Sequence, residues 1–159
     1  MADVDSSAPL PPADRPSPTA RVDPRHELGR LGERLACEHF ERLGFRVLER
    51  NVRSRGGEID LIAFDGTTLV FVEVKTCRAR AGAATAAQAG PRAAAGPDAG
   101  PLAGLRPRQR ARVRRQAVAW LCDRRRQRPS ARAIRLDAVG VTVDARGRLV
   151  RLEHLEAAW

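Results

Sequence analysis

The chain has 159 residues, three cysteines and a formal net charge of +10, and this length suits a single domain. Its apolar runs fall short of the roughly 18 residues that predict a membrane-spanning helix. The proline-broken start also lacks the basic and apolar segments of a signal peptide. We therefore expect a cytoplasmic protein without a membrane partner. Three widely spaced cysteines argue against a disulfide framework and against a structural zinc site.

Two segments lack the apolar residues that a core needs. Residues 1–25 hold six of the eleven prolines, and so little apolar surface cannot offset the entropy cost of ordering the chain. They are predicted to form a disordered tail. Residues at about 79–104 are mostly Ala, Gly, Pro and Arg, which predicts a flexible loop. Residues 26–159, including this loop, are expected to form one domain.

The first half of the domain predicts one helix and three strands. The helix is indicated by apolar residues, Leu43 among them, that recur at spacings of three and four. The last two strands flank Asp65-Gly66, which is a strong signal for a hairpin. In chain order these elements are a helix over 26–43, a short strand over 46–52 and two strands over 58–64 and 67–75.

The second half predicts a further helix over 106–125 and two strands over 134–143 and 149–155. Pro107 fits the first turn of that helix, where its missing N–H costs no hydrogen bond. The order of the elements, αβββαββ, indicates a mixed α/β domain.

A two-residue turn at Asp65-Gly66 would fix the register of the hairpin. It would pair Phe64 with Thr67, Ile62 with Leu69, Asp60 with Phe71 and Glu58 with Glu73. Since side chains alternate along a strand, one face would carry Glu58, Asp60, Glu73 and Lys75. The other face would carry Ile59, Leu61, Val70, Val72 and Val74.

Three carboxylates crowded on one face of a hairpin repel one another. A hard divalent cation such as Mg²⁺ would relieve this repulsion, because it takes oxygen ligands from one or two carboxylates. A simpler alternative is that Glu73 pairs with Lys75 or with nearby arginines. Lys75 is the only lysine beside 28 arginines, and a compact ammonium can orient a water molecule as a planar guanidinium cannot. Both interpretations remain open from the residues alone.

Positive charge is concentrated in residues 105–128, which contain ten arginines and one acid. Such a stripe is typical of a protein that binds a polyanion, since the release of counterions from phosphates supplies affinity. The alternatives are a solvated helix face and a surface that meets an acidic protein partner.

Several motifs together resemble the YraN-like bacterial proteins. They are Gly32-Glu33, Gly44-Phe45, Asn51, Gly57-Glu58-Ile59-Asp60-Leu61-Ile62 and Val70-Phe71-Val72-Glu73-Val74-Lys75. That family is similar to the PD-(D/E)xK nuclease superfamily, which shares the restriction endonuclease-like fold with Holliday junction resolvases. The resemblance covers residues 26–78 well, is weaker over 106–121 and resumes at 135–137 and 154–156.

The resemblance implies a role for each matching residue. Asp60 and Glu73 would be metal ligands together with the main-chain carbonyl of Val74, and Lys75 would be the catalytic amine. Glu33 would be a further acid of the catalytic group, and Glu58 an auxiliary acid. The arginines expected to hold the nucleic-acid backbone are Arg53, Arg55, Arg108, Arg112 and Arg115.

We therefore expect a restriction endonuclease-like mixed sheet flanked by helices and a Mg²⁺- or Mn²⁺-dependent endonuclease that hydrolyses DNA phosphodiester bonds, with branched or junction DNA as a candidate substrate. The rival interpretation is a non-catalytic nucleic-acid-binding module of the same fold. The sequence leaves open which DNA structure is bound and whether two copies pair as a homodimer.

Overall fold

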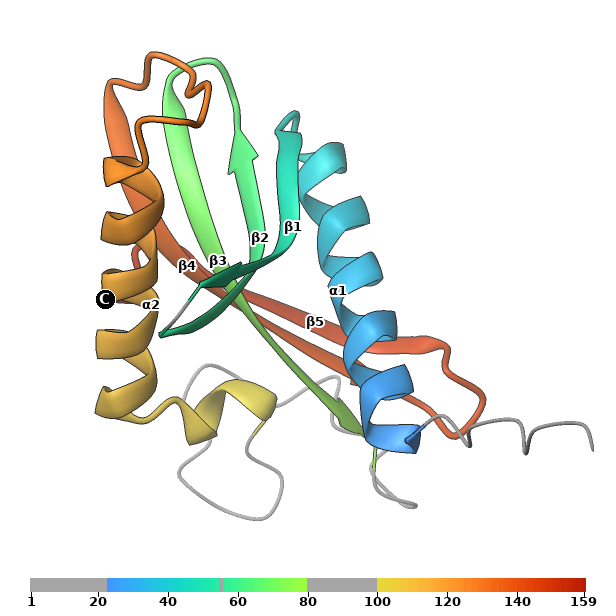
Figure 1. Cartoon of the computed structure of the whole chain (residues 1–159). Coiled ribbons are helices and arrows are strands. Elements are labelled where there is room, and N and C mark those ends of the chain that lie inside the picture. The colour runs from blue at the N-terminus through green and yellow to red at the C-terminus, as the bar shows by residue number, and fades with distance from the viewer. Residues whose placement is uncertain (1–22, 55, 80–99) are drawn as a thin grey trace, which may run out of the picture.

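The computed structural model describes residues 23–54, 56–79 and 100–159. Most of the predicted tail, the centre of the predicted loop and Arg55 lie outside these ranges. The predicted fold class is confirmed: a five-stranded mixed sheet, in the order β1-β2-β3-β4-β5, has one helix packed on each side (Figure 1). No helix within the described ranges is long and apolar enough to cross a membrane.

The elements follow the predicted order, with one short 3-10 helix added before the second α-helix. Strands β3 and β4 are parallel, and the other neighbouring pairs are antiparallel. The bounds are α1 (Pro24–Arg42), β1 (Arg46–Ser54), β2 (Gly57–Phe64), β3 (Thr68–Arg78), η2 (Pro101–Gly104), α2 (Pro107–Cys122), β4 (Ala133–Val143) and β5 (Leu149–Leu155).

Three predicted boundaries are corrected by local contacts. Helix α1 begins inside the predicted tail, because the Asp23 carboxylate accepts a hydrogen bond from the Arg25 N–H and caps the helix. The predicted loop ends before η2, which lies against Gly140 of β4. Helix α2 stops three residues before its predicted end, since Asp123 takes an extended conformation. Leu43, predicted on the apolar stripe of the first helix, is 50% exposed at the end of α1.

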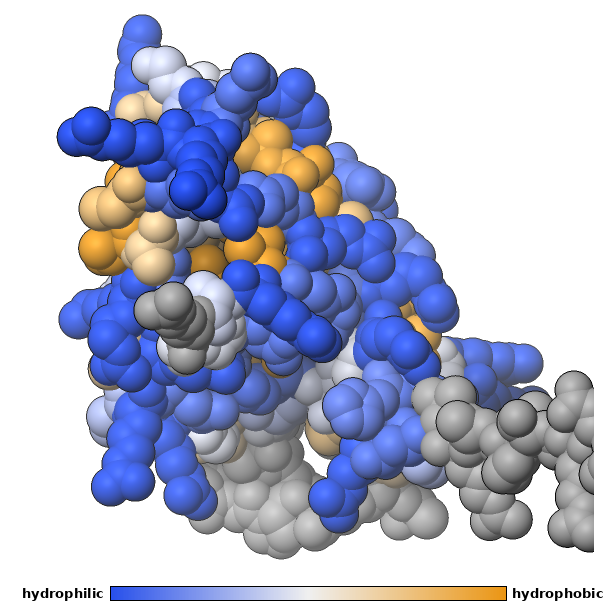
Figure 2. All heavy atoms as spheres, viewed as in Figure 1, coloured by the Kyte–Doolittle hydropathy of each residue, from blue (hydrophilic) through white to orange (hydrophobic). Residues whose placement is uncertain are grey.

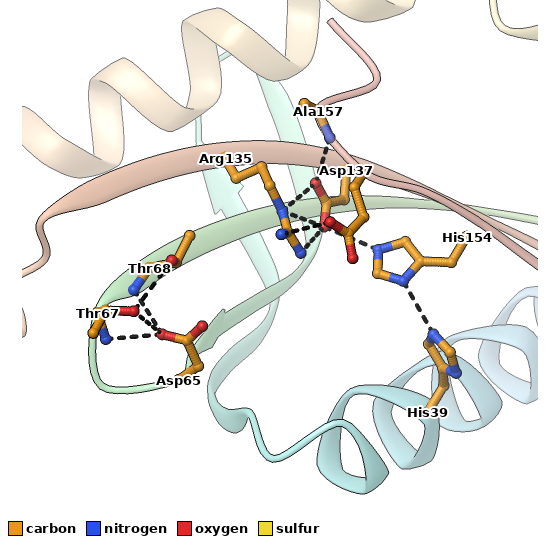
Figure 3. Close-up of polar contacts among 9 residues, drawn as sticks. His39, Asp65, Thr67, Thr68, Arg135, Asp137, His154 and Ala157 are labelled. Carbon is orange, nitrogen blue, oxygen red and sulfur yellow. Dashed lines mark hydrogen bonds and ion pairs between the residues drawn. The ribbon is translucent and has the colours of Figure 1, made fainter.

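The predicted register of the central hairpin is wrong by two residues. The structure pairs Phe64 with Leu69, so residues 65–68 separate the last paired positions of the two strands. The Asp65 carboxylate accepts hydrogen bonds from the backbone N–H groups of Thr67, at 2.8 Å, and Thr68, at 2.7 Å, and closes this longer turn (Figure 3). Because side chains alternate with a period of two, a shift of two residues leaves the faces of the strands unchanged.

The sheet buries a separate apolar cluster on each face. Phe40 and other residues of α1 pack on one face, and Trp120 of α2 packs beside Phe71 on the other. Ile59 was predicted to share a face with Leu61, but it belongs to the cluster under α2. Strand β2 pairs with β3 only from Leu61 onward and continues with β1 alone, so its first residues turn toward α2.

Candidate functional site

A cleft of about 410 Å³ opens where β2 parts from β3. Helix α1 contributes one wall of the cleft and α2 contributes a single arginine. The structure brings together here all of the acids and the lysine that the sequence singles out. The lining residues are Arg25, Leu28, Gly29, Glu33, Glu58, Asp60, Glu73, Val74, Lys75, Thr76 and Arg112.

Glu73 is the most buried charged group of the cleft, with 1% of its surface exposed. Its Oε1 atom lies 2.6 Å from Lys75 Nζ, which sits two residues along the same face of β3. Arg112 Nη2 donates to both carboxylate oxygens, at 2.8 and 3.0 Å. A buried carboxylate without such partners would be strongly unfavourable. The contacts match the simpler of the two interpretations of the crowded acids, in which cations of the chain neutralise Glu73.

Asp60 lies beside this cluster on β2. Its Oδ2 atom accepts a hydrogen bond of 2.7 Å from the backbone N–H of Val74, so the side chain bridges to β3 just beyond their last paired residues. Burial and then the charge of Glu73 raise the pKa of the Asp60 carboxyl to about 7, against the lowering effects of Val74 N–H and Lys75. Asp60 is therefore poised between its neutral and charged forms at neutral pH.

The two remaining acids occupy the edges of the cleft. Glu58 has a side chain that is 44% exposed, and its Oε2 atom lies 3.5 Å from Nε of Arg53. Glu33 enters from α1, and its charge contributes to the raised pKa of Asp60. The crowding predicted for Glu58, Asp60 and Glu73 thus holds mainly for the last two.

Asp60 and Glu73 suit a hard divalent cation by the chemistry of their donor atoms. Within the described ranges, no three His, Cys, Asp or Glu side chains are gathered closely enough to form a metal site by themselves. Mg²⁺ does not require three, since it commonly takes one or two carboxylates and completes its coordination with water and phosphate. Burial is the larger cause of the raised pKa of Asp60, and the second cause, repulsion by Glu73, is one that a cation would remove.

The predicted arginines are dispersed around this cleft. Arg112 lines it, whereas Arg108 and Arg115 are exposed on α2 outside the lining, at helical spacings of four and three from Arg112. Arg53 is exposed beside Glu58. Arg55 lies outside the described residues.

Sequence reasoning missed two features of the site. Arg25 lines the cleft from the first turn of α1, and its spacing of four from Gly29 and eight from Glu33 could have placed it on that face. Gln116, buried on α2 one turn after Arg112, accepts a hydrogen bond from the Ser54 hydroxyl and holds the end of β1 against α2.

Gly57 sets how closely the β1–β2 turn approaches α2. Its φ of +134° is unfavourable for other residues, and a Cβ atom there would lie 3.2 Å from Cδ of Arg112. Gly57 therefore lies close against the stem of Arg112, whose guanidinium reaches Glu73.

A second cluster of titratable groups surrounds the buried Asp137 on β4 (Figure 3). Its carboxylate accepts hydrogen bonds from Arg135, from the Ala157 N–H and, with an N–O distance of 2.9 Å, shares one with His154. A ring nitrogen of His154 lies 3.1 Å from one of His39 on α1. None of these residues lines the cleft, so the cluster ties α1 and the chain end to the sheet.

The chain matches the model of a family described as uncharacterised protein family UPF0102 over residues 32–141. A relative from Mycobacterium avium is 41% identical over 134 residues, which are 83% of this chain and 89% of that protein. One from Streptomyces griseus is 40% identical over 133 residues, 84% of this chain and 96% of that protein. One from Acidothermus cellulolyticus is 44% identical over 100 residues, but the match covers only 63% of that protein and 62% of this chain. All three are named UPF0102 proteins.

Proposed function

Because the chain belongs to the protein family UPF0102, we propose its function from the chemistry of its own cleft: hydrolysis of DNA phosphodiester bonds with Mg²⁺ or Mn²⁺. The predicted YraN-like membership is confirmed. The place of the family within the PD-(D/E)xK nuclease superfamily stays a prediction, and the sheet flanked by two helices is consistent with it.

One observation carries the proposal. The only lysine of a chain with 28 arginines lies in the same cleft as Asp60 and the buried Glu73. A purely structural ion pair does not require lysine, since arginine pairs with carboxylates at least as well. A small ammonium beside two carboxylates is instead suited to hold a water molecule and to meet charge that develops on phosphorus.

Each residue of the cleft would have its own role in the reaction. Asp60 and Glu73, with the carbonyl of Val74, would hold Mg²⁺, whose contribution is Lewis-acid activation of the phosphodiester. Lys75 would orient the attacking water through its three N–H donors. Glu33 and Glu58 would act as auxiliary acids at the two edges of the cleft.

Binding of the DNA backbone is proposed for the arginines around the cleft. Figure 2 shows mostly hydrophilic side chains on the side of the molecule in view, which includes α2, with some apolar atoms at the upper left. Arg108 and Arg115 are exposed on this helix and Arg53 on β1, and Arg55 would join them. Such contacts position the backbone without selecting a sequence.

Cleavage of DNA tests this proposal. Labelled duplex, nicked, flap and four-way junction DNA would be incubated with the protein in Mg²⁺, in Mn²⁺ and in EDTA. We expect metal-dependent cleavage of at least one substrate and a loss of about 100-fold or more in Lys75→Arg, which keeps the charge but not the ammonium. Glu156→Gln, which alters an exposed carboxylate paired with Arg135 outside the cleft, should cleave normally. Equal rates for Lys75→Arg and the unmodified chain would refute the role of Lys75.

The neutralised Glu73 favours one alternative, a non-catalytic nucleic-acid-binding module. A carboxylate already paired with Lys75 and Arg112 is stable without a metal. This alternative predicts DNA binding that is indifferent to Mg²⁺ and survives Asp60→Asn, with no cleavage of any DNA in the panel.

A further inference from the structure

We propose that Arg112 is an exchangeable partner of Glu73: a DNA phosphate takes the guanidinium away from the carboxylate and thereby frees Glu73 for a divalent cation. The inference rests on the proposed function and names how the same cleft is regulated. Arg112 would be a positioning residue that couples the binding of substrate to the binding of metal.

Glu73 cannot pair with Arg112 and hold a divalent cation at the same time. Lys75 and Arg112 together supply three contacts of 2.6 to 3.0 Å to its two oxygens. A divalent cation placed on this carboxylate would meet the positive charge of Arg112 at close range. The arginine must therefore move before Glu73 can become a metal ligand.

Arg112 has unused hydrogen-bond donors for another acceptor. Its Nε atom is buried and has no hydrogen-bond partner among the described residues. Its contacts with Glu73 use only Nη2, although a guanidinium offers five donors in a planar fork that matches phosphate. An unpaired buried donor is costly, so a phosphate that enters the cleft offers a more complete set of hydrogen bonds.

Arg112 can move while Lys75 stays, because the two side chains come from different elements. Their exposure is similar, 33% for Arg112 and 30% for Lys75, but Arg112 comes from α2, whereas Lys75 belongs to the same strand as Glu73. Gly57 lies close against the stem of the arginine, and Arg112 lines the open cleft. A short swing of the guanidinium separates the pair without disturbing the helix.

Thermodynamic linkage makes the coupling reciprocal. DNA raises the affinity for the cation by the same factor by which the cation raises the affinity for DNA. The metal-free protein is therefore held in a state in which its own arginine blocks the metal ligand. Substrate would assemble the site that acts on it.

The test measures DNA affinity without metal, so it does not depend on cleavage. A short fluorescein-labelled duplex would be titrated in EDTA with the unmodified chain, Glu73→Gln, Arg112→Gln and the double variant. We expect Glu73→Gln to tighten DNA binding by about fivefold, because the competing carboxylate is gone, and to have almost no effect in the Arg112→Gln background. Glu156→Gln makes the same change of charge outside the cleft and without a contact to Arg112, and should alter affinity by less than about twofold.

Three outcomes are distinguishable. Equal effects of Glu73→Gln and Glu156→Gln, or an effect that persists without Arg112, would overturn the exchange and leave the nuclease proposal intact. An absence of DNA binding by the unmodified chain would overturn both.

If Glu73→Gln fails to fold, a titration of Mg²⁺ into Arg112→Gln without DNA tests the exchange instead. The cation should bind about threefold more tightly than to the unmodified chain, with Arg114→Gln as the unchanged control, and equal or weaker binding overturns the exchange.

Discussion

The position of Asp60 beside Glu73 lowers the stability of the metal-free protein when both carboxyls are charged. The carboxyl is partly buried beside Glu73, and burial together with the charge of Glu73 raises its pKa from the ordinary value of 3.8 to about 7. The folded protein therefore keeps the proton that the unfolded chain releases between these values. Protonation of Asp60 therefore contributes to the free energy of unfolding. This contribution is fully present below about pH 3.8 and is lost as the pH rises through 7. A bound cation would reverse this loss by favouring the charged form.

Asp60→Asn should therefore stabilise the metal-free protein at high pH. The amide keeps an oxygen for the Val74 N–H but carries no charge to repel Glu73. In EDTA at pH 8 we expect the free energy of unfolding to rise by about 2 to 4 kcal/mol, and the gain should shrink as the pH falls from 7 toward 4. Urea unfolding at several pH values measures this difference. A variant that is less stable than the unmodified chain at pH 8 would contradict the assigned environment of Asp60.

The packing of α1 on β3 determines where Glu33 and Arg25 enter the cleft. Gly32 lies directly against Thr76: a Cβ atom at position 32 would stand 1.7 Å from Oγ1 of that threonine. This close contact allows the first turns of the helix to form one wall of the cleft. A larger residue would push α1 away from the sheet.

Gly32→Ala is expected to lower the free energy of unfolding by about 1 to 3 kcal/mol, because the new methyl group overpacks the interface. Gly29→Ala, one turn earlier, is the matched control. Its Cβ atom would meet only Glu33 Oε1, at 4.0 Å, so the substitution should stabilise the helix by up to about 1 kcal/mol. Thermal unfolding measures the change in stability of both variants. A similar change in the two would show that α1 does not pack on β3 through Gly32.

The local elements were largely predictable, because each has its own signal in the sequence. The apolar spacing of α1 and the β-rich runs of β2 and β3 are properties of short segments. The register of the β2–β3 hairpin was not predictable, since Asp65-Gly66 suits a two-residue turn as well as the observed longer one. Hydrogen bonds from Thr67 and Thr68 to the Asp65 side chain decide between them.

The contacts that define the site depend on packing between distant segments. Arg112 and Glu73 are separated by 39 residues, and their pairing requires α2 to lie over the parted ends of β2 and β3. The sequence indicated which acids share a face of the hairpin, and the cleft contains them. It could not indicate that an arginine of α2, one of ten between residues 105 and 128, would fold inward rather than face solvent.

Most of the net positive charge of the chain is carried by α2 and the residues that follow it. Exposed arginines on this helix should contribute to DNA affinity mainly through the release of counterions. The double substitution Arg108→Gln/Arg115→Gln is expected to reduce the slope of log K against log salt by about 2 and to weaken binding to all sequences alike. Binding titrations at several salt concentrations measure the slope.

The matched control is Arg146→Gln/Arg148→Gln in the turn between β4 and β5. Both arginines are exposed, and the turn lies on the opposite side of Figure 1 from α2. The change in net charge is the same, so a general effect of charge would reduce the slope equally. An equal reduction in the two double variants would contradict a DNA-binding surface on α2.

The proposed cleavage of DNA requires a divalent cation held by Asp60 and Glu73, and calorimetric titration of Mn²⁺ tests this binding most directly. We predict one site per chain in the presence of a short DNA duplex, after subtraction of the heat of Mn²⁺ binding to the DNA alone. Its affinity should fall by about tenfold or more in Asp60→Asn and in Glu73→Gln and should be unchanged in Glu156→Gln. Binding that is absent from the unmodified chain, or that persists undiminished in Asp60→Asn, would contradict the assignment of the cleft as a metal-dependent site.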